Sequence, residues 1–203
     1  TVVHEHVDNN GDKRYVELSA YPVKNEAGEA IEFVHLSRDI TDRIKKDKEI
    51  KENYDIQNGV NSLLRLSLKD ISLSELLNNA LDIILTIPNL SFKSTGSIFL
   101  VKDNLESLVL EVQRGFSEAH KLACAMVPFG KCICGKVALN KIGRFVNCID
   151  ENHEIRYAGI SPHGHYCVPI VFGDKIIGIL NLLGVLNLYV AEGHLYTQRE
   201  EEL

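Results

Sequence analysis

A polar helical stretch divides this chain of 203 residues into two parts that both carry β-strand patterns. Residues Asp42–Ile50 contain no glycine or proline, and their interleaved opposite charges support a solvated helix through pairs spaced four residues apart. Asp39 or Thr41 can cap its start. A broken apolar stripe continues through Val60, Leu64, Leu68 and Ile71. The sequence therefore predicts a linker helix over residues 42–71, either a solvated spacer or a parallel dimer-forming helix that carries a signal between domains.

Three strands in an antiparallel meander are expected before this helix, within residues 1–41. Runs of β-forming residues cover Val2–Val7, Tyr15–Tyr21 and Ile31–Asp39. Turn-forming residues at 9–12 and 25–28 separate these runs. A sheet of this size is not expected to be a stable domain alone.

The part of the chain after the linker alternates between helix and strand patterns. Apolar residues at helical spacing begin after Ser72 or Ser74, and Pro88 ends that helix. The remaining expected elements are strands at Gly96–Val101, Ser107–Arg114 and Phe145–Ile149, helices at 117–125 and 136–140, a loop at Gly130–Gly135, a hairpin of Tyr166–Phe172 with Ile176–Tyr189, and a helix from Gln198. This order predicts an α+β domain, an antiparallel sheet with helices packed on it.

One irregularity affects the last expected strand. I-L-N-L at 179–182 is followed six residues later by V-L-N-L at 185–188. A duplication that lengthens the strand and a bulge near Gly184 both explain this repeat, so the strand register stays open.

Composition narrows the classes of function. Apolar residues make up 45% of the chain, enough for a packed core, whereas a net charge of −6 argues against a nucleic-acid-binding surface, which must be basic. No apolar run reaches the roughly 18–20 residues that span a bilayer. Thr1 begins directly in strand-like sequence, and the five cysteines are an odd number in a chain too long to need a disulfide framework. We expect a cytoplasmic chain with reduced thiols, no nucleic-acid partner and no membrane segment.

Cysteine and histidine gather between Gly130 and Pro169. The seven residues are Cys132, Cys134, Cys148, Cys167, His153, His163 and His165. Thiolate and imidazole bind borderline and soft metals, and thiols also perform redox chemistry. This gathering predicts a functional site in a loop-rich segment.

The C-x-C motif of Cys132 and Cys134 is placed in an extended loop just before a short helix near Gly135. Two residues apart in such a loop, both sulfurs point the same way, and the N–H groups of the helix start favour thiolate. Simple packing as small buried residues is the alternative. For Cys148, after a short strand, a ligand role and core packing are equally open.

The second motif is H-G-H-Y-C, in which His163, His165 and Cys167 alternate and so share a face of an extended chain. A neutral imidazole beside a thiolate suits zinc, iron or nickel, and it equally suits a Cys–His pair of raised nucleophilicity. The motifs lack the C-x-x-C spacing of a typical zinc site. His153, in a polar stretch, is expected at the surface, and Cys124 is expected to be a structural buried cysteine.

The candidate metal ligands are accordingly Cys132, Cys134, Cys148, His165 and Cys167. His163 joins these five as a candidate cofactor-binding residue. No residue is assigned a catalytic role.

Two segments resemble known signalling domains. Y-V-E-L-S-A-Y-P-V at 15–23, a turn at Gly28 and S-R-D-I-T-D-R at 37–43 are similar to the last strands of a PAS domain, which often exits into a signalling helix through D-I-T-[DE]-R. Residues from about Ser72 to the end resemble a GAF domain. That likeness lies in G-S-I-F-L-V at 96–101, G-K-C-I-C-G-K-V-A at 130–138, V-P-I at 168–170 and L-L-G-V-L-N-L-Y at 182–189.

These resemblances predict a division of the chain. Residues 1–41 would be the C-terminal part of a PAS domain, 42–71 a signalling linker helix, and 72–203 a GAF domain whose final helix is incomplete. The Cys-rich motifs resemble a GAF subgroup attached to bacterial sensor histidine kinases. The family implies a six-stranded antiparallel sheet with flanking helices.

The same resemblance implies a sensory role. We expect the input region of a bacterial signal-transduction protein, a histidine kinase, whose GAF domain is not an enzyme and senses a small ligand, a metal or redox state through its Cys/His cluster. Expected partners are a second copy bound through the linker helices, a ligand or metal in the GAF pocket, and an output domain in the same chain. Zinc, iron and an iron–sulfur cluster are the candidate cofactors.

Two other functions stay open. A GAF domain that binds nothing small would act as a dimerisation and interaction module. A Cys–His enzyme is the third hypothesis, because some GAF-fold proteins reduce methionine sulfoxide with cysteines in this region. The sequence has no phosphate-cradling G-x-x-x-x-G-K-[ST] motif.

Overall fold

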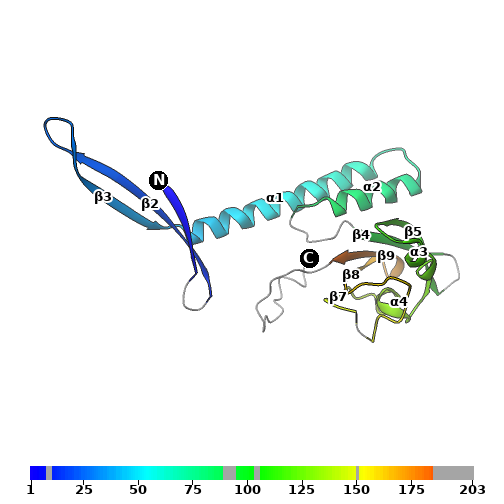
Figure 1. The fold of residues 1–203 in the computed structure, drawn as a ribbon. Coiled ribbons are helices and arrows are strands. Elements are labelled where there is room, and N and C mark those ends of the chain that lie inside the picture. The colour runs from blue at the N-terminus through cyan, green and yellow to red at the C-terminus, as the bar shows by residue number, and fades with distance from the viewer. Residues whose placement is uncertain (8–10, 89–94, 103–105, 150, 185–203) are drawn as a thin grey trace. The chain divides into compact units, whose positions relative to one another are not determined.

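The computed structural model describes residues 1–7, 11–88, 95–102, 106–149 and 151–184. The chain separates into two compact units, Thr1–Asn58 and Gly59–Leu203. Figure 1 shows the elements of both units.

The first unit contains a three-stranded antiparallel sheet in the order β1-β2-β3, which confirms the predicted meander. Its strands are β1 (Val2–Val7), β2 (Lys13–Lys24) and β3 (Ala30–Asp39). The turn between β2 and β3 places Gly28 at φ 82°, where its N–H donates to the carbonyl of Asn25. Glycine reaches this left-handed conformation without steric cost. The sheet leaves large apolar side chains exposed, among them Val2, Ile31 and Phe33.

Helix α1 (Thr41–Ser67) follows directly. The carboxylate of Asp39 accepts a hydrogen bond from the Thr41 N–H at 2.9 Å, and the Thr41 hydroxyl accepts one from the Tyr15 N–H, also at 2.9 Å. These bonds join the helix start to the sheet. The helix ends four residues before the predicted Ile71, because the hydroxyl of Ser67 donates back to the carbonyl of Leu64 at 2.8 Å and a turn begins.

Helix α2 (Leu73–Leu85) begins where the sequence predicted, since the Ser72 hydroxyl caps it by accepting the N–H of Glu75. The helix covers one face of the second sheet (Figure 1). Leu81 is fully buried there against Ile98 and Leu182. The side chain of Arg114 holds the other side of α2 through two bonds to the carboxylate of Asp82, at 2.7 and 2.9 Å.

The second sheet has six strands in the order β6-β5-β4-β9-β8-β7, and every pairing is antiparallel. The strands are β4 (Thr95–Val101), β5 (Ser107–Arg114), β6 (Met126–Pro128), β7 (Arg144–Val146), β8 (Gly164–Phe172) and β9 (Lys175–Gly184). An antiparallel sheet flanked by helices confirms the α+β fold class. Strand β6 is an addition that the sequence patterns did not predict.

The opposite face of this sheet packs against helix α4 (Cys132–Asn140), and α3 (Glu118–Ala123) precedes it. The core on this side includes Phe99, Ile133 and Ile179, all almost fully buried. Neighbouring residues of β4 point to opposite faces, so Ile98 contacts the α2 side and Phe99 the α4 side.

The start of α4 corrects one prediction. Residues 130–135 were expected to be a loop, and the helix was expected only from residue 136. The helix begins at Cys132, whose φ of 57° turns the chain from the preceding loop into the helix. The Gly130 N–H donates to the Gly135 carbonyl at 2.8 Å and closes this turn.

Two expectations fall on residues that the structure does not describe. They are the repeated V-L-N-L unit at 185–188 and the helix from Gln198. Within the described residues, no helix is both long enough and apolar enough to cross a membrane.

The close approach at Gly135 gives the first testable prediction. A β-carbon at this position would clash with the backbone carbonyl oxygen of Pro128, whereas one at Gly143 would meet its nearest atom at 3.6 Å. Gly135→Ala is therefore expected to lower the free energy of unfolding by about 1–3 kcal/mol. Gly143→Ala is the matched control and is expected to stay near the wild type. Urea unfolding followed by circular dichroism compares the two, and equal losses would contradict this account.

Candidate metal centre and thiol pair

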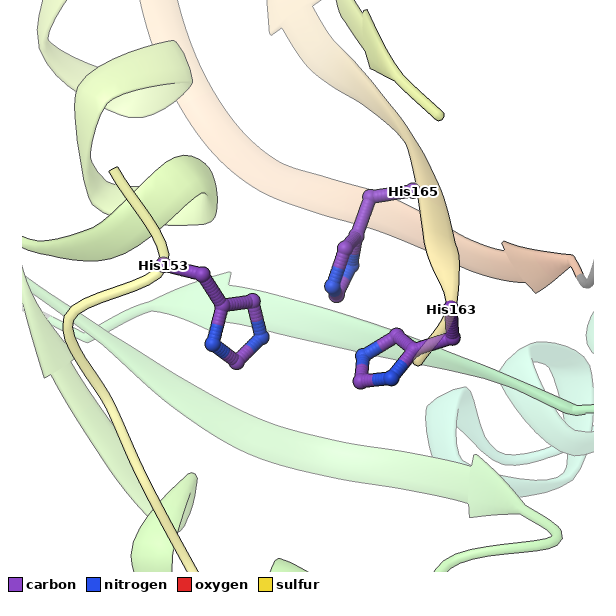
Figure 2. Close-up of side chains that lie close together, drawn as sticks. All are labelled: His153, His163 and His165. Atoms are coloured by element: carbon purple, nitrogen blue, oxygen red, sulfur yellow. The ribbon is translucent and has the colours of Figure 1, made fainter. Parts of the chain in front are cut away.

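Three buried histidines face one another on the α4 side of the sheet. His163 immediately precedes β8, His165 lies in β8, and His153 reaches in from the loop after β7 (Figure 2). Only 3% of His153, 9% of His163 and 4% of His165 is exposed. One ring nitrogen from each lies within 4.8 Å of those of the other two.

In His163 and His165, a hydrogen bond at Nδ1 leaves Nε2 as the ring nitrogen without a partner. Nδ1 of His163 lies 2.6 Å from the carbonyl of Ser161, and Nδ1 of His165 lies 3.1 Å from Oδ1 of Asn181. Because both acceptors are oxygens without a proton, the neutral form of each ring carries its proton on Nδ1 and has a lone pair on Nε2. Histidines that bind metals commonly have their other ring nitrogen held in this way.

Three nitrogens of the cluster are buried without a hydrogen-bond partner among the residues that the structure describes. They are Nδ1 of His153 and Nε2 of His163 and His165. Buried polar atoms are nearly always partnered, and leaving one unsatisfied costs about 1–3 kcal/mol. Three such atoms at one place therefore indicate that the cluster is built to hold something.

Burial also sets the protonation of the cluster. The pKa of His165 is lowered to about 3, mainly by desolvation and also by the nearby His163 and His153, against the opposing hydrogen bond to Asn181. Desolvation likewise lowers the pKa of His153. Both rings are consequently neutral at pH 7, and neutral imidazole is the form that coordinates a metal ion.

The donor set fits an ion of the zinc or iron type. Three imidazoles with an open fourth position are a known arrangement for zinc. Nitrogens 4.8 Å apart would lie about 2.8 Å from a central ion, so the rings would move inward by about 0.7 Å to reach the usual Zn–N distance. That movement is within reach of His153 and His163, which are both carried by loop residues.

The loop that carries His153 is attached to helix α4 by one lysine. Nζ of Lys136 lies 3.2 Å from Oδ1 of Asn152 and 2.9 Å from a carboxylate oxygen of Glu154. The hydrogen bond from Lys136 lowers the pKa of Glu154. These contacts flank His153 on both sides, which explains how a polar loop delivers a buried imidazole.

Two thiols lie next to the histidine cluster and are linked to it. Sγ of Cys134, in α4, is 3.6 Å from Sγ of Cys167, in β8. The Cys167 thiol donates at 3.2 Å to Oδ1 of Asn181, the same oxygen that accepts from His165. The hydrogen bond to Cys167, followed by desolvation, raises the pKa of Cys134 well above its ordinary value.

A small cavity of about 20 Å³ adjoins both groups. This volume is enough for about one water-sized molecule. His153 and His165 contribute to its wall beside Cys132 and Cys134. The remaining lining residues are Phe99, Phe116, His120, Cys124, Val127, Ile133, Ile155 and Asn181.

Five of the six residues taken from the sequence lie in this region. Cys132, Cys134 and His165 line the cavity, and Cys167 and His163 contact its lining residues. Their roles as ligands stay predictions. Cys148 was expected to face the same hollow, but it is exposed and lies outside the cavity wall.

The argument from the C-x-C spacing also needs correction. Cys132 and Cys134 are in a helix, where residues two apart do not face the same way, so the extended-loop geometry does not apply. Both are nevertheless buried, and desolvation raises the pKa of Cys132 as well. Among the described residues, the group close enough to hold an ion consists of the three histidines and includes no cysteine.

Sequence reasoning missed two members of the site. His153 was expected at the surface, because its neighbours in sequence are polar. His120 had no partner pattern, yet it stacks between Phe116 and Tyr157, with ring centroids 3.5 and 4.2 Å away, and lines the cavity. Apolar Ile155, two residues after His153, was a signal that this loop turns inward.

Comparisons with known proteins agree with the fold. The family model for the GAF domain matches residues 70–203, and a model for the PAS fold matches residues 1–45. The chain belongs to the GAF domain family, whose members are commonly sensory, and carries a PAS-like N-terminal segment. No curated protein matches its sequence.

Solved structures of similar fold include a reductase and GAF domains. Free methionine-R-sulfoxide reductase from Neisseria meningitidis shares 18% identity, over 66% of this chain and 75% of that one, with a TM-score of 0.54. The GAF domain of A. aeolicus nlh2 shares 15% identity over 74% and 86%, with a TM-score of 0.54. The GAF domain of an Acinetobacter phosphoenolpyruvate-protein phosphotransferase shares 12% identity over 74% and 85%, with a TM-score of 0.55. At these identities the likeness shows the fold alone.

The stacked histidine gives a prediction of pH dependence. Desolvation lowers the pKa of His120 from 6.5 to about 4. Between these values the unfolded chain binds a proton that the native state does not, so the free energy of unfolding falls as the pH falls. In the metal-free protein, His120→Phe keeps the stack and is expected to reduce this slope by at most about 1.4 kcal/mol per pH unit.

Urea unfolding at a series of pH values between 4 and 7 measures the slope. Tyr157→Phe alters the same stack without changing titration in this range, and it is expected to keep the wild-type slope. A slope that His120→Phe leaves unchanged would contradict the burial of a neutral imidazole.

Proposed function

We propose that this chain is the sensory input region of a signal-transduction protein, and that its GAF domain senses a transition-metal ion bound by His153, His163 and His165. The observation that carries the proposal is the cluster of three buried histidines, in which each ring has one nitrogen without a hydrogen-bond partner among the described residues and one nitrogen within 4.8 Å of those of the other two rings. Family membership supports a sensory role, and the burial of neutral imidazoles supports a metal as the ligand.

The ligand type favours zinc or iron over calcium or magnesium. Hard cations prefer oxygen ligands, and the cluster offers imidazole nitrogen only. Of the cofactors considered from the sequence, an iron–sulfur cluster has less support, because it needs several thiolates in contact with iron. Cys148 is exposed, and burial raises the pKa of Cys132 and of Cys134.

The metal proposal predicts one ion per chain. Titration of metal-free protein with Co²⁺, whose absorption bands report tetrahedral coordination, is expected to saturate at one equivalent, and Zn²⁺ is expected to displace it. His165→Ala or His153→Ala is expected to weaken binding more than about a hundredfold, beyond the 10–100-fold lost with residues that only orient a ligand.

His120→Phe is the matched control for this titration, because it changes a buried histidine of the same cavity outside the cluster. It is expected to keep the affinity of the wild type within a few-fold. Binding that survives the loss of His153 and His165 would place the ion elsewhere and defeat the proposal.

We also assign this GAF domain to a larger cytoplasmic protein, a bacterial histidine kinase, that signals as a homodimer and carries its output domain in the same chain. Its PAS-like segment leads directly into the 27-residue helix α1, an order that suits transfer of a signal along the chain. Apolar side chains stand exposed along α1 at Ile50, Tyr54 and Leu64. In a parallel dimer, helix α1 of a second copy would cover these apolar side chains.

The dimer is testable by sedimentation equilibrium. The chain is expected to sediment as a dimer, and the double substitution Tyr54→Glu with Leu64→Glu is expected to give monomers by placing charges in the helix interface. Glu49→Lys with Glu52→Lys, on the charged side of α1, is the control. A wild-type chain that is monomeric at high concentration would refute the dimer without affecting the metal proposal.

An enzyme is the second candidate, and one contact favours it. The thiols of Cys134 and Cys167 are close enough for cysteine redox chemistry, and free methionine sulfoxide reductases share the fold. A nucleophilic cysteine needs a lowered pKa, however, and the pKa of Cys134 is raised. An assay of free methionine sulfoxide reduction with a thiol reductant tests this candidate, and catalytic turnover would establish the protein as an enzyme.

A further inference from the structure

A contact between two sulfur atoms joins two elements of the GAF core. Cys134 is the third residue of α4, and Cys167 lies in the middle of β8, with their sulfurs 3.6 Å apart. A disulfide needs about 2.05 Å. The approach required is thus about 1.5 Å, which a small shift of the helix against the strand can supply.

We propose that Cys134 and Cys167 form a redox modification site, and that their oxidation to a disulfide by a peroxide weakens metal binding at the three histidines. The second half of this inference rests on the proposed function. The first half, the disulfide itself, stands on the thiol geometry alone.

The chemistry balances with one hydrogen peroxide. The Cys134 thiol lines the cavity, and attack of its sulfur on the peroxide breaks the O–O bond, leaves a sulfenic acid and releases one water. The Cys167 sulfur then attacks the sulfenic sulfur, the S–S bond forms, and a second water leaves with the remaining thiol proton. Two thiols and one peroxide give one disulfide and two waters, with two electrons passing from sulfur to oxygen.

Burial decides which oxidant can act and how fast. Cys167 is fully buried, and the cavity beside Cys134 has room for about one water-sized molecule. Hydrogen peroxide, which has one oxygen atom more than water, is therefore the oxidant to expect, and a peptide disulfide is too large. The raised pKa of Cys134 keeps the reactive thiolate scarce. The pair therefore responds to sustained oxidation and is not a fast peroxide trap.

The link to the metal site passes through Asn181. Its Oδ1 accepts from both the Cys167 thiol and Nδ1 of His165, while its Nδ2 donates to Ser97 at 3.4 Å. A disulfide removes the thiol proton and draws the sulfur of Cys167 toward Cys134. Asn181 loses one of its two donors, and the ring of His165 loses part of what orients it. Complete loss of such an orienting partner typically costs 10–100-fold in metal affinity, so the partial loss at His165 is expected at the lower end of that range.

The test uses the full chain, reduced and metal-free, treated with hydrogen peroxide in excess. Digestion and mass spectrometry are expected to give a linked peptide pair joining Cys134 to Cys167, lighter by two hydrogen atoms. Zn²⁺ affinity, measured by competition with a chromophoric chelator before and after treatment, is expected to fall about tenfold or more. Reduction of the treated protein is expected to restore it.

Matched cysteine variants keep the test decisive. Cys134→Ala is expected to form no disulfide and to keep its Zn²⁺ affinity after peroxide. Cys132→Ala changes a buried cysteine of the same helix and cavity, and it is expected to behave as the wild type. Circular dichroism before treatment establishes that each variant is folded.

Each outcome decides one part of the inference. A linkage to Cys124 or Cys132 instead, or oxidation without any linkage, overturns the modification site. A Cys134–Cys167 disulfide with unchanged Zn²⁺ affinity overturns the coupling alone. Failure of both reduced and oxidised protein to bind Zn²⁺ overturns the coupling together with the proposed function, and the mapped disulfide still stands.

Discussion

A row of hydrogen-bonded side chains crosses the inner face of the GAF sheet and connects the histidine cluster to the thiol pair. The antiparallel register pairs Ser97 of β4 with Asn181 of β9, and Asn181 with Cys167 of β8. Because directly paired residues point to the same face, the three side chains meet inside an otherwise apolar core. Asn181 is buried and can remain there only if its amide is satisfied, which Ser97, Cys167 and His165 accomplish. This requirement fixes the rotamer of His165 and the position of the Cys167 thiol together.

Local sequence patterns predicted most strands of the two sheets, because alternating side chains and turn-forming residues mark where a strand begins and ends. Alternation and turn residues located β1 and β5 at their observed bounds, and they located β4 and the starts of β8 and β9 to within two residues. The predicted end of the last strand at Tyr189 lies outside the described residues, and Ser72 marked the start of α2. The first turn of helix α4 was not predicted, because two glycines flank the C-x-C motif and favoured a loop there. Gly135 is in the helix for lack of space beside Pro128, a tertiary constraint that propensity does not contain.

The site was less predictable for the same reason. Alternation in H-G-H-Y-C placed His165 and Cys167 on one face, since a strand fixes the direction of its side chains and both residues lie in β8. His163, one residue before the strand, lies beside His165. His153 depends on a loop that only Lys136 and the surrounding core hold in place, so its polar neighbours were misleading. Cys148 was expected to face the cavity but is exposed, because a cysteine just beyond a short edge strand can turn to solvent as easily as inward.

A change at the histidine cluster has a defined route to the helices through the strands that carry it. His165 pairs with Leu183 of β9, and the adjacent Leu182 points to the other face, where it packs with Leu81 of α2. Closing three imidazoles by about 0.7 Å on an ion would displace β8 and its loop, and close-packed interiors transmit such displacements because they have few voids to absorb them. Helix α2 packs on the sheet through β4 and β5, so the sheet lies between the histidine cluster and α2. If the histidine cluster binds an ion as proposed, the paired strands β8 and β9 are the part of the sheet through which that binding would act on helix α2.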